Sequence, residues 1–316
     1  MPTRLVDLEF EESNLTINQL KTLVAVVESG SITAAAKRLY VTQAAVSTAL
    51  ASLRSEVEVD LFVREGRSIR LTSAGSILFE YAKKILGLMD EATSVTRGSG
   101  ADAKRTLRIA AVTTAGEALL PQWLDSYLRE DSDIEIKVEV SNRSRVFDLL
   151  ENHNVDLAIC GTPPPNRLFE VRAVRSHKLF VVAGGGWLAR TEYFDDESSV
   201  IELLTNSPWL VREEGSGTRS NSDELITRLN IAPQLFTLSS NVAIKEATLL
   251  GVGVALLSID SVKDEVADGS LAILKVPSTP IEKSWNLVVR RGENLNAVAS
   301  SFLDHIVETG HVARID

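Results

Sequence analysis

Cysteine and histidine are scarce in this chain, and their scarcity excludes several kinds of site. The single cysteine among 316 residues, Cys160, cannot form an internal disulfide, so a reducing compartment, the cytoplasm, is expected. It stands in an apolar stretch that predicts a buried strand, where a thiol is more often a small core residue than a reactive group. The four histidines, at positions 153, 177, 305 and 311, lack metal-ligand spacing. We therefore expect no metal site and no cofactor.

Long apolar runs and a general basic excess are also missing. No segment is apolar over the length of a membrane span, and the N-terminus lacks the apolar core of a secretory signal, so no membrane partner is expected. The net charge of −10 argues against a protein that coats nucleic acid without selectivity. Residues 1–97 hold 11 basic and 12 acidic residues, whereas residues 98–316 hold 22 and 31. The acidic excess therefore lies mostly in the second part. A hydrophobic share of 44% over this length predicts two or more domains.

Residues 31–53 (SITAAAKRLYVTQAAVSTALASL) predict two short helices joined by a tight turn at Tyr40 and Val41. Ser31 and Thr42 stand at the expected N-cap positions, where a hydroxyl accepts a free N–H of the first helical turn. In the second helix, apolar residues at 46, 50, 53 and 57 form one inward stripe. By itself this motif fits an ordinary helical hairpin as well as a DNA-binding one.

The outer face of the second helix begins with small or hydrogen-bonding side chains: Gln43, Ala44, Ser47 and Thr48. No acidic group stands among them, which is typical of a recognition helix whose first turns lie in a DNA major groove. Within residues 37–70, six basic residues stand against four acidic ones, a balance that suits a dimer reading specific sites. We therefore expect the N-terminal part to bind double-stranded DNA.

The flanking segments favour the DNA-binding interpretation. Residues 16–19 (TINQ) form a capping box that opens an earlier helix, and residues 61–71 (LFVREGRSIRL) predict a β-hairpin with a glycine in its turn. Three helices and a basic hairpin make a winged helix-turn-helix at residues 15–72, with Arg64, Arg67 and Arg70 placed to meet phosphates. Residues 1–14 are an acidic N-terminal extension of unassigned purpose.

A long helix over residues 73–97 is predicted after the hairpin, with Thr72 as its cap. Its apolar positions repeat at steps of four and three: Ala74, Leu78, Tyr81, Ile85, Leu88, Ala92 and Val95. Such a heptad seam predicts a partner helix, and hence a homodimer through this linker helix. Residues 98–104 (GSGADAK) then form a hinge.

This N-terminal part resembles the LysR-type transcriptional regulators. The shared residues are Leu20, Val24, Ala25, Val26, Gly30, Ser31, Ala34, Ala35, Ala36, Leu39, Val41, Thr42, Gln43, Val46, Ser47, Leu53, Leu61, Phe62, Val63, Arg64, Arg67 and residues 71–75 (LTSAG). Most relatives have Pro where this chain has Ala44, and Arg or another long polar residue where it has Thr48. The loss of a guanidinium there shifts the expected reading of bases to Gln43, Ser47 and the wing. The resemblance also implies that two dimers join into a homotetramer.

From residue 105 onward, apolar runs alternate with helical patterns, which is the pattern of βα units. Strands are expected at 107–112, 134–140, 157–160, 179–183, 209–211, 236–238, 254–257, 271–274 and 285–289, with helices at 117–129, 145–152 and 295–309. The two halves resemble the type 2 periplasmic-binding-protein fold that the family uses as its effector domain. Lobe I would span about 105–177 and 282–316, and lobe II about 178–281. The predicted fold is therefore α+β multi-domain: a winged helix-turn-helix, a dimerisation linker helix and a two-lobed α/β effector domain.

Four loops of this second half are expected to form a ligand cleft. Thr113 and Thr114 follow the first strand, Gly161 and Thr162 follow the third, residues 214–219 (EGSGTR) open a helix, and residues 239–241 (SSN) open another. Strand ends and helix N-termini of this kind bind anions. Each loop alone is more often an ordinary cap or turn, but four on one face favour a site. The expected effector contacts are Thr113, Thr114, Gly161, Thr162, Ser216, Gly217, Thr218 and Asn241.

The second half also resembles, more narrowly, the branch with the Rubisco-operon regulators (CbbR) and some sulfur-assimilation regulators. The shared stretches lie within residues 108–121, 140–143, 156–159, 215–219 and 240–258. An effector domain's resemblance does not fix its ligand, and it implies only a small, acidic metabolite.

Two other functional classes compete with a ligand-responsive regulator. A solute-binding protein would carry a signal peptide and no DNA-binding domain. An α/β enzyme would need a nucleophile, for which Ser216 and Thr218 are the candidates, but no base stands at a recognisable spacing. We therefore expect a regulator and not an enzyme.

Overall fold

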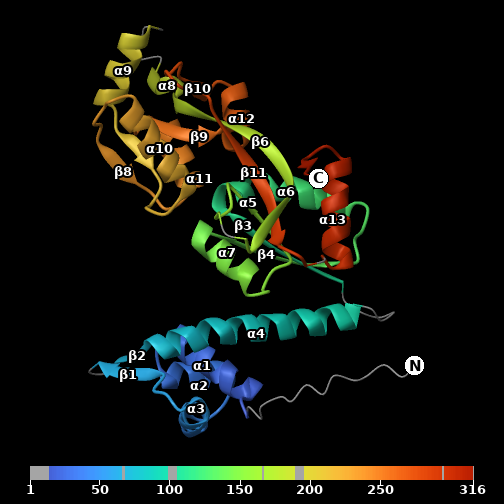
Figure 1. Ribbon diagram of the computed structural model, residues 1–316. Helices are drawn as coiled ribbons and strands as arrows, with labels where there is room; N and C mark the ends of the chain where they lie inside the picture. The colour runs from blue at the N-terminus through green and yellow to red at the C-terminus, as the bar shows by residue number, and fades with distance from the viewer. Residues whose placement is uncertain are drawn as a thin grey trace. The chain divides into compact units, whose positions relative to one another are not determined.

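The computed structural model describes residues 14–65, 68–98, 105–165, 167–188, 196–293 and 295–315. The chain divides into two compact units, Met1–Thr93 and Ser94–Asp316, and the elements of each are labelled in Figure 1. The expected N-terminal extension falls almost wholly, and the expected hinge largely, outside the described residues. In the parts of the chain described, no helix is both long and apolar enough to cross a bilayer.

Three short helices begin the first unit: α1 (Ile17–Ser29), α2 (Ile32–Leu39) and α3 (Gln43–Val57). The predicted capping box is confirmed, since the Thr16 and Gln19 side chains each accept the other's backbone N–H. Ser31 and Thr42 are confirmed as N-caps, at 3.2 and 3.1 Å from the N–H groups that they accept. Tyr40, in the left-handed region at φ 56°, makes the tight turn between α2 and α3.

The hairpin after these helices is confirmed as β1 (Phe62–Glu65) paired antiparallel with β2 (Ser68–Leu71). The core beneath it joins α1, α3 and the following helix through Leu20, Leu23, Leu53, Leu61 and Ala82. A second cluster, between α1, α2 and α3, contains the alanines of α2 that let the helices cross closely. The first unit is therefore a winged helix-turn-helix.

Helix α4 (Ser73–Gly98) begins as predicted, with the Gly75 N–H donating to Thr72 Oγ1 at 2.9 Å. The expected apolar seam is only partly right. Leu78 packs against the core under the hairpin, and Ile77 beside it is 61% exposed. Val95 lies where side chains are not described. The exposed stripe instead follows Ile77, Tyr81, Ile85, Leu88 and Ala92, because one face of α4 is already used by the helices below it.

One continuous eight-stranded sheet forms the frame of the second unit. Its parallel part has β3 (Thr106–Val112) between β4 (Glu135–Ser141) and β5 (Leu157–Cys160). The long strands β6 (Phe169–Gly184) and β11 (Ile281–Arg290) pair antiparallel along the length of β11. Strands β9 (Ala255–Ser258), β10 (Leu271–Ile273) and β12 (Ala313–Arg314) pair with β6.

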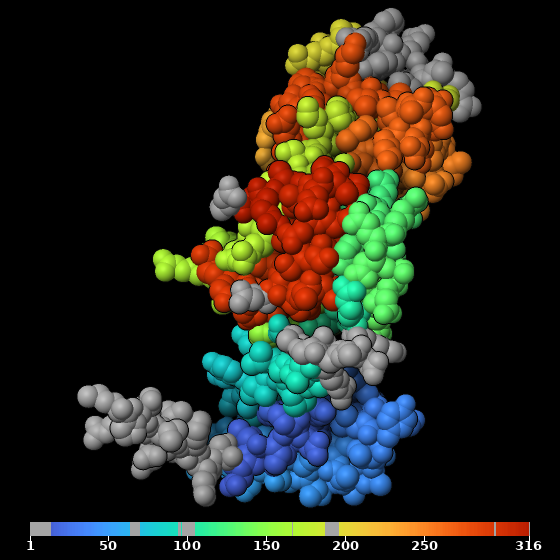
Figure 2. All heavy atoms as spheres, turned by 90° about the vertical axis from the view of Figure 1, so that its right-hand side faces the viewer, coloured from blue at the N-terminus to red at the C-terminus, as the bar shows by residue number. Residues whose placement is uncertain are grey.

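Helices on both faces of this sheet make lobe I. Helices α5 (Thr113–Ala118), α6 (Leu120–Leu128) and α13 (Ala297–Glu308) cover one face, in a core with Trp123, Tyr127 and Phe302. Helix α7 (Arg143–Glu151) covers the other face. Figure 2 shows α13, in red, beside α6, in green, and the Ser126 hydroxyl lies 2.7 Å from His305 Nε2 at this contact.

Lobe II lies at the other end of β6 and β11 (Figure 1). It contains the parallel pair β7 (Trp209–Val211) and β8 (Leu235–Thr237), and the helices α8 (Gly185–Leu188), α9 (Glu197–Asn206), α10 (Gly217–Arg228), α11 (Asn241–Leu249) and α12 (Ile259–Ala267). Its two cores lie on opposite sides of β6, β7 and β9. Two α/β lobes joined by two strands are the predicted effector-domain fold.

Every strand predicted for this unit is present, whereas the starts of two strands, one predicted helix and several unpredicted elements differ from the expectation. Strand β6 begins ten residues before the predicted stretch 179–183, and β11 begins four residues before 285. The expected helix 117–129 is two helices, α5 and α6, with a break at Leu119 before Pro121. Helices α8, α9 and α12 and the short strand β12 were not predicted.

Candidate functional site

The outer face of α3 is exposed where the sequence predicts contact with DNA. Gln43, Ala44, Ser47 and Thr48 are all exposed, whereas Val46 between them is 1% exposed and packs inward. Thr42 is exposed as well, and its hydroxyl caps the helix. The first two turns of α3 therefore present the side chains expected of a recognition helix.

The wing is described only in part. Arg64 lies on β1, but its side chain, like the whole of Arg67, falls outside the described residues. Arg70 on β2 is exposed. The expected phosphate contacts of Arg64 and Arg67 remain predictions.

A cavity of about 420 Å³ lies between the two lobes of the second unit. Its walls are the end of β3, the end of β5 and the starts of α7, α10 and α11, and its floor is the β6–β11 ribbon. All eight residues that the sequence predicts as effector contacts line it: Thr113, Thr114, Gly161, Thr162, Ser216, Gly217, Thr218 and Asn241. The volume falls within the range of small-molecule sites.

The start of α10 offers free donors to this cavity. Ser216 occupies the N-cap position and is 8% exposed, yet its hydroxyl makes no capping hydrogen bond. The preceding Gly215 has φ 84°, a conformation that favours glycine. Because neither the hydroxyl nor the first-turn N–H groups are used by a side-chain cap, they can bind an anion.

A hydrogen bond joins the lobes across the cavity. The Asn241 amide, at the start of α11 in lobe II, donates to Thr114 Oγ1 of lobe I at 2.7 Å. Asn241 is 4% exposed, and its Oδ1 has no partner among the described residues. A buried, half-satisfied amide is costly, so a ligand that completes its hydrogen bonds is favoured there.

Three cations that the sequence analysis did not select also line the cavity: Arg143, Arg212 and Lys283. The Arg212 side chain is 4% exposed, and two 2.8 Å hydrogen bonds from it to Glu213 hold the pKa of that carboxyl below its usual value. Arg143 lies over the Phe147 ring, 5.4 Å from its centroid. Among the described residues of the lining, the one carboxylate is therefore already paired, which leaves the site positive and suited to an anion.

The floor carries a stacked pair. The His177 ring on β6 lies 4.1 Å from the Trp285 ring on β11, at 10° to it, and its Nδ1 is 3.1 Å from Ser258 Oγ. Burial lowers the pKa of His177 to about 4, so the imidazole is neutral at neutral pH. Its position in the cavity was not predicted, because only the register of β6 and β11 brings these residues together.

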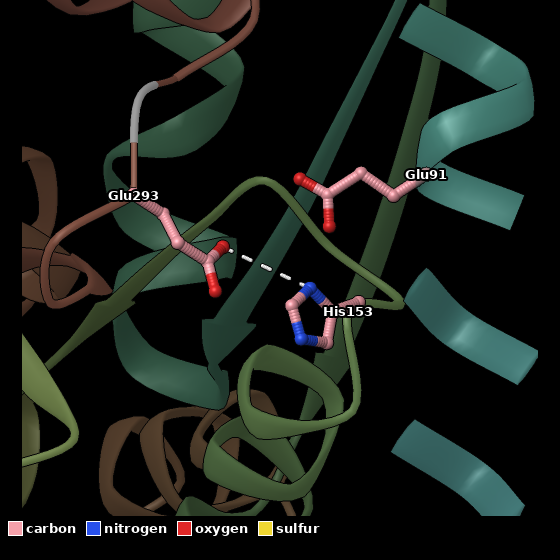
Figure 3. A group of neighbouring side chains, drawn as sticks. All are labelled: Glu91, His153 and Glu293. Carbon is pink, nitrogen blue, oxygen red and sulfur yellow. Dashed lines mark ion pairs between the residues drawn. The ribbon is translucent and has the colours of Figure 1, made fainter. Parts of the chain in front are cut away.

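Two of the other histidines, His153 and His305, pair with glutamates. His153 Nδ1, at the end of α7, lies 3.7 Å from Glu293 Oε2 within the second unit; Figure 3 draws this ion pair, together with Glu91 of the first unit. His305 Nδ1 lies 2.9 Å from Glu130 Oε2, which ties α13 to α6. None of these pairs lines the cavity.

Cys160 is a core residue, as predicted. It is fully buried, and burial raises the pKa of its thiol to about 12. The thiolate is therefore not populated at neutral pH, and the group is not a nucleophile.

Comparison with known proteins places the two units in one family. Residues 17–76 match the bacterial regulatory helix-turn-helix protein, lysR family, and residues 100–310 match the LysR substrate binding domain. The chain is similar to the HTH-type transcriptional activator CmpR of Synechocystis, at 32% identity over 93% of this chain and 95% of the relative. It is also similar to the HTH-type transcriptional regulator CbbR of Rhodospirillum rubrum, at 31% identity over 91% and 94%.

Among solved structures, the regulatory domain of Synechocystis CcmR in complex with 2-phosphoglycolate (2-PG) matches 65% of this chain and 97% of that domain. The identity is 27% and the TM-score 0.57. The relatives named here are transcription regulators, not enzymes, which agrees with the expectation of a regulator over an α/β enzyme. The helix-turn-helix likewise removes the solute-binding alternative. The chain belongs to the LysR family of transcription regulators.

Proposed function

We propose that this regulator reads promoter DNA with α3 and responds to a small, doubly anionic metabolite held between its lobes. The observation that carries the ligand proposal is the cavity itself: uncapped donors at the start of α10 face a space whose cations outnumber its single, paired carboxylate. The uncapped donors are themselves neutral, so they bind an anion without adding to the buried charge that must be desolvated when the site is empty.

A phosphorylated carboxylate fits the arrangement best. A phosphate at the start of α10 would accept from the backbone N–H groups and from Ser216 and Thr218, as helix N-termini bind such groups. Lys283 on the floor and Arg143 on lobe I are then available to a carboxylate at the other end. The match to a regulatory domain bound to 2-phosphoglycolate supports this class of ligand.

The test is a titration of the full chain with 2-phosphoglycolate, followed by tryptophan fluorescence, since Trp285 lies on the cavity floor. We expect micromolar affinity, with glycolate binding far more weakly. Each charge-assisted hydrogen bond contributes about 1.5–3 kcal/mol, so Thr218→Ala should weaken binding roughly 10- to 150-fold.

Thr227→Ala is the matched control. Thr227 lies at the far end of the same helix, exposed, with its hydroxyl bonded to the Asp223 carbonyl, so this change should leave affinity unaltered. Unchanged affinity in both Thr114→Ala and Thr218→Ala would place the ligand elsewhere.

For DNA, we propose that Gln43 and Ser47 contact base edges and that Thr42, Arg64 and Arg67 contact phosphates. Support comes from the exposed face of α3. Ser31, Ala44 and Thr48 complete the proposed interface, Ser31 as the cap that sets the start of α2. An electrophoretic shift on DNA upstream of the chain's own gene tests the activity, and protein that fails to shift it in preference to random DNA would contradict the proposal.

The proposed assembly is a homodimer through α4, with two dimers forming a homotetramer. The exposed apolar stripe of α4 supports the first contact. We further propose the cytoplasm as the place of action, since a promoter-binding protein works where the DNA is.

A further inference from the structure

His177 lies on the cavity floor, and its ring makes polar and stacking contacts beyond those of a side chain that only fills space. It is 7% exposed and held flat on Trp285. Its Nδ1 lies 3.1 Å from Ser258 Oγ, and its Nε2 has no hydrogen-bond partner among the described residues. The ring therefore has a fixed orientation and one unused nitrogen at a site lined for an anion.

The charges around His177 oppose one another while the site is empty. Asp260 on α12 favours the protonated ring, whereas Arg175 on the same strand and Lys283 on β11 disfavour it. Asp260 is itself held by Arg175 at 2.8 Å, so its effect on the ring is shared. The remaining charged groups of the cavity lining are Arg143, Arg212 and Glu213. Burial is the largest effect, and it lowers the pKa of His177 to about 4.

A bound anion changes this balance. A carboxylate or phosphate within hydrogen-bond reach of Nε2 favours the imidazolium, both as an opposite charge and as an acceptor of a second N–H. The indole of Trp285 supports the same form, because its face attracts a cation stacked at this distance. The Ser258 hydroxyl can accept from Nδ1–H, so the protonated ring has a partner for each nitrogen.

We propose that His177 is a ligand-binding residue that takes up a proton from solvent when the anion binds, so that effector affinity rises as pH falls. The proposal rests on the proposed function, since it requires an anion between the lobes. Its sign follows from linkage: the pKa of His177 is higher in the complex than in the empty site, so binding is tighter below the pKa of the complex and weakens as pH rises through it. At full coupling the dissociation constant would change about tenfold per pH unit.

Isothermal titration of the full chain with 2-phosphoglycolate at pH 6.5, in buffers of different ionisation enthalpy, measures the protons taken up on binding. The phosphate of the probe titrates near pH 6 as well, so the comparison is with His177→Gln, which carries only the probe's share. We expect the wild-type protein to take up about half a proton more than the variant. Between pH 6.5 and 7.5 its dissociation constant should rise about twofold more than that of the variant. His311→Gln, a histidine outside the cavity beside Trp123, should behave as wild type.

Equal proton uptake by wild type and His177→Gln, with binding intact, would overturn this proposal and leave the effector site standing. No binding of 2-phosphoglycolate by the wild-type protein would overturn both. If His177→Gln does not fold, tryptophan fluorescence of the wild-type protein tests the proposal instead. An imidazolium stacked on an indole quenches its emission, so acidification from pH 8 to 6.5 should quench Trp285 in the saturated protein and not in the empty one. The same fluorescence change in both states would refute proton uptake at His177.

Discussion

Replacing Ile85 with aspartate should separate the linker helices of two protomers without unfolding the first unit. Ile85 is 43% exposed and faces away from the core beneath α4. Its neighbours along the stripe, Ile77, Tyr81 and Leu88, are 61%, 61% and 53% exposed. A partner helix is the simplest cover for so continuous an apolar stripe.

The size of the effect follows from these exposed fractions. Full burial of an aliphatic side chain contributes about 1.5–3 kcal/mol, so covering a half-exposed one contributes roughly 1 kcal/mol. Four such side chains on each of two protomers supply roughly 8 kcal/mol before association costs. Aspartate at 85 removes about 2 kcal/mol of this and places two carboxylates in the seam, which costs several kcal/mol more. The dissociation constant of the helix pair should therefore rise more than roughly a hundredfold.

Leu78→Asp is the informative comparison, because Leu78 packs on the core of the winged helix-turn-helix. Its loss should lower the free energy of unfolding of the first unit by about 3 kcal/mol or more, whereas Ile85→Asp should leave that energy unchanged. Sedimentation equilibrium of the full chain measures the mass, and thermal unfolding measures the stability. An unaltered mass for Ile85→Asp at micromolar concentration would refute the seam, and a stable Leu78→Asp would refute the packing.

Three further predictions concern DNA contact, pH and the thiol. Gln43→Ala should lose about 1–3 kcal/mol of discrimination between operator and random DNA in a competition shift assay. The control, Thr22→Ala on the inner side of α1, should keep that discrimination. An unchanged preference for the operator in Gln43→Ala would show that α3 does not read the bases. Burial lowers the pKa of His177 from 6.5 to about 4, so between these pH values the unfolded chain binds a proton that the folded protein does not. The free energy of unfolding of the empty protein should therefore fall by up to about 3 kcal/mol as pH falls from 6.5 to 4. In urea titrations over the same pH range, His177→Gln should lose less stability. Equal slopes for the two proteins would contradict this. Cys160, with a pKa raised to about 12, should react with a thiol reagent at pH 7.5 only in denaturant, and rapid labelling of the native protein would show that the thiol is not buried.

Local signals made the first unit predictable. The caps Thr16, Ser31 and Thr42 act within three residues of themselves, so the sequence contains both partners of each hydrogen bond. The phase of the α4 stripe was harder, because α4 serves the core and solvent on adjacent faces. Heptad spacing cannot tell Ile77 from Leu78 when both are apolar neighbours on one helix.

The cavity residues likewise fall into two groups, those that local sequence signals predict and those that they do not. Hydroxyls and glycines at strand ends and helix starts could be selected, since parallel strands end at one edge of a sheet. His177 and Lys283 could not, because they face each other only through the pairing of two strands about a hundred residues apart. Among the first ten residues of β6 only Phe169, Ala173 and His177 are buried, and the stretch carries several charges, a weaker strand signal than the apolar run that follows.

The β6–β11 ribbon has a mechanical consequence. Because both connections between the lobes are strands bonded to each other from Phe169 to Leu179, neither can swing as a free hinge. Any closure of the lobes must therefore occur as torsion of the ribbon, in which the backbone bonds persist and the twist between neighbouring strands changes. Any change in the angle between the lobes would therefore be spread as small rotations over the paired residues of both strands, and no single residue would act as the pivot.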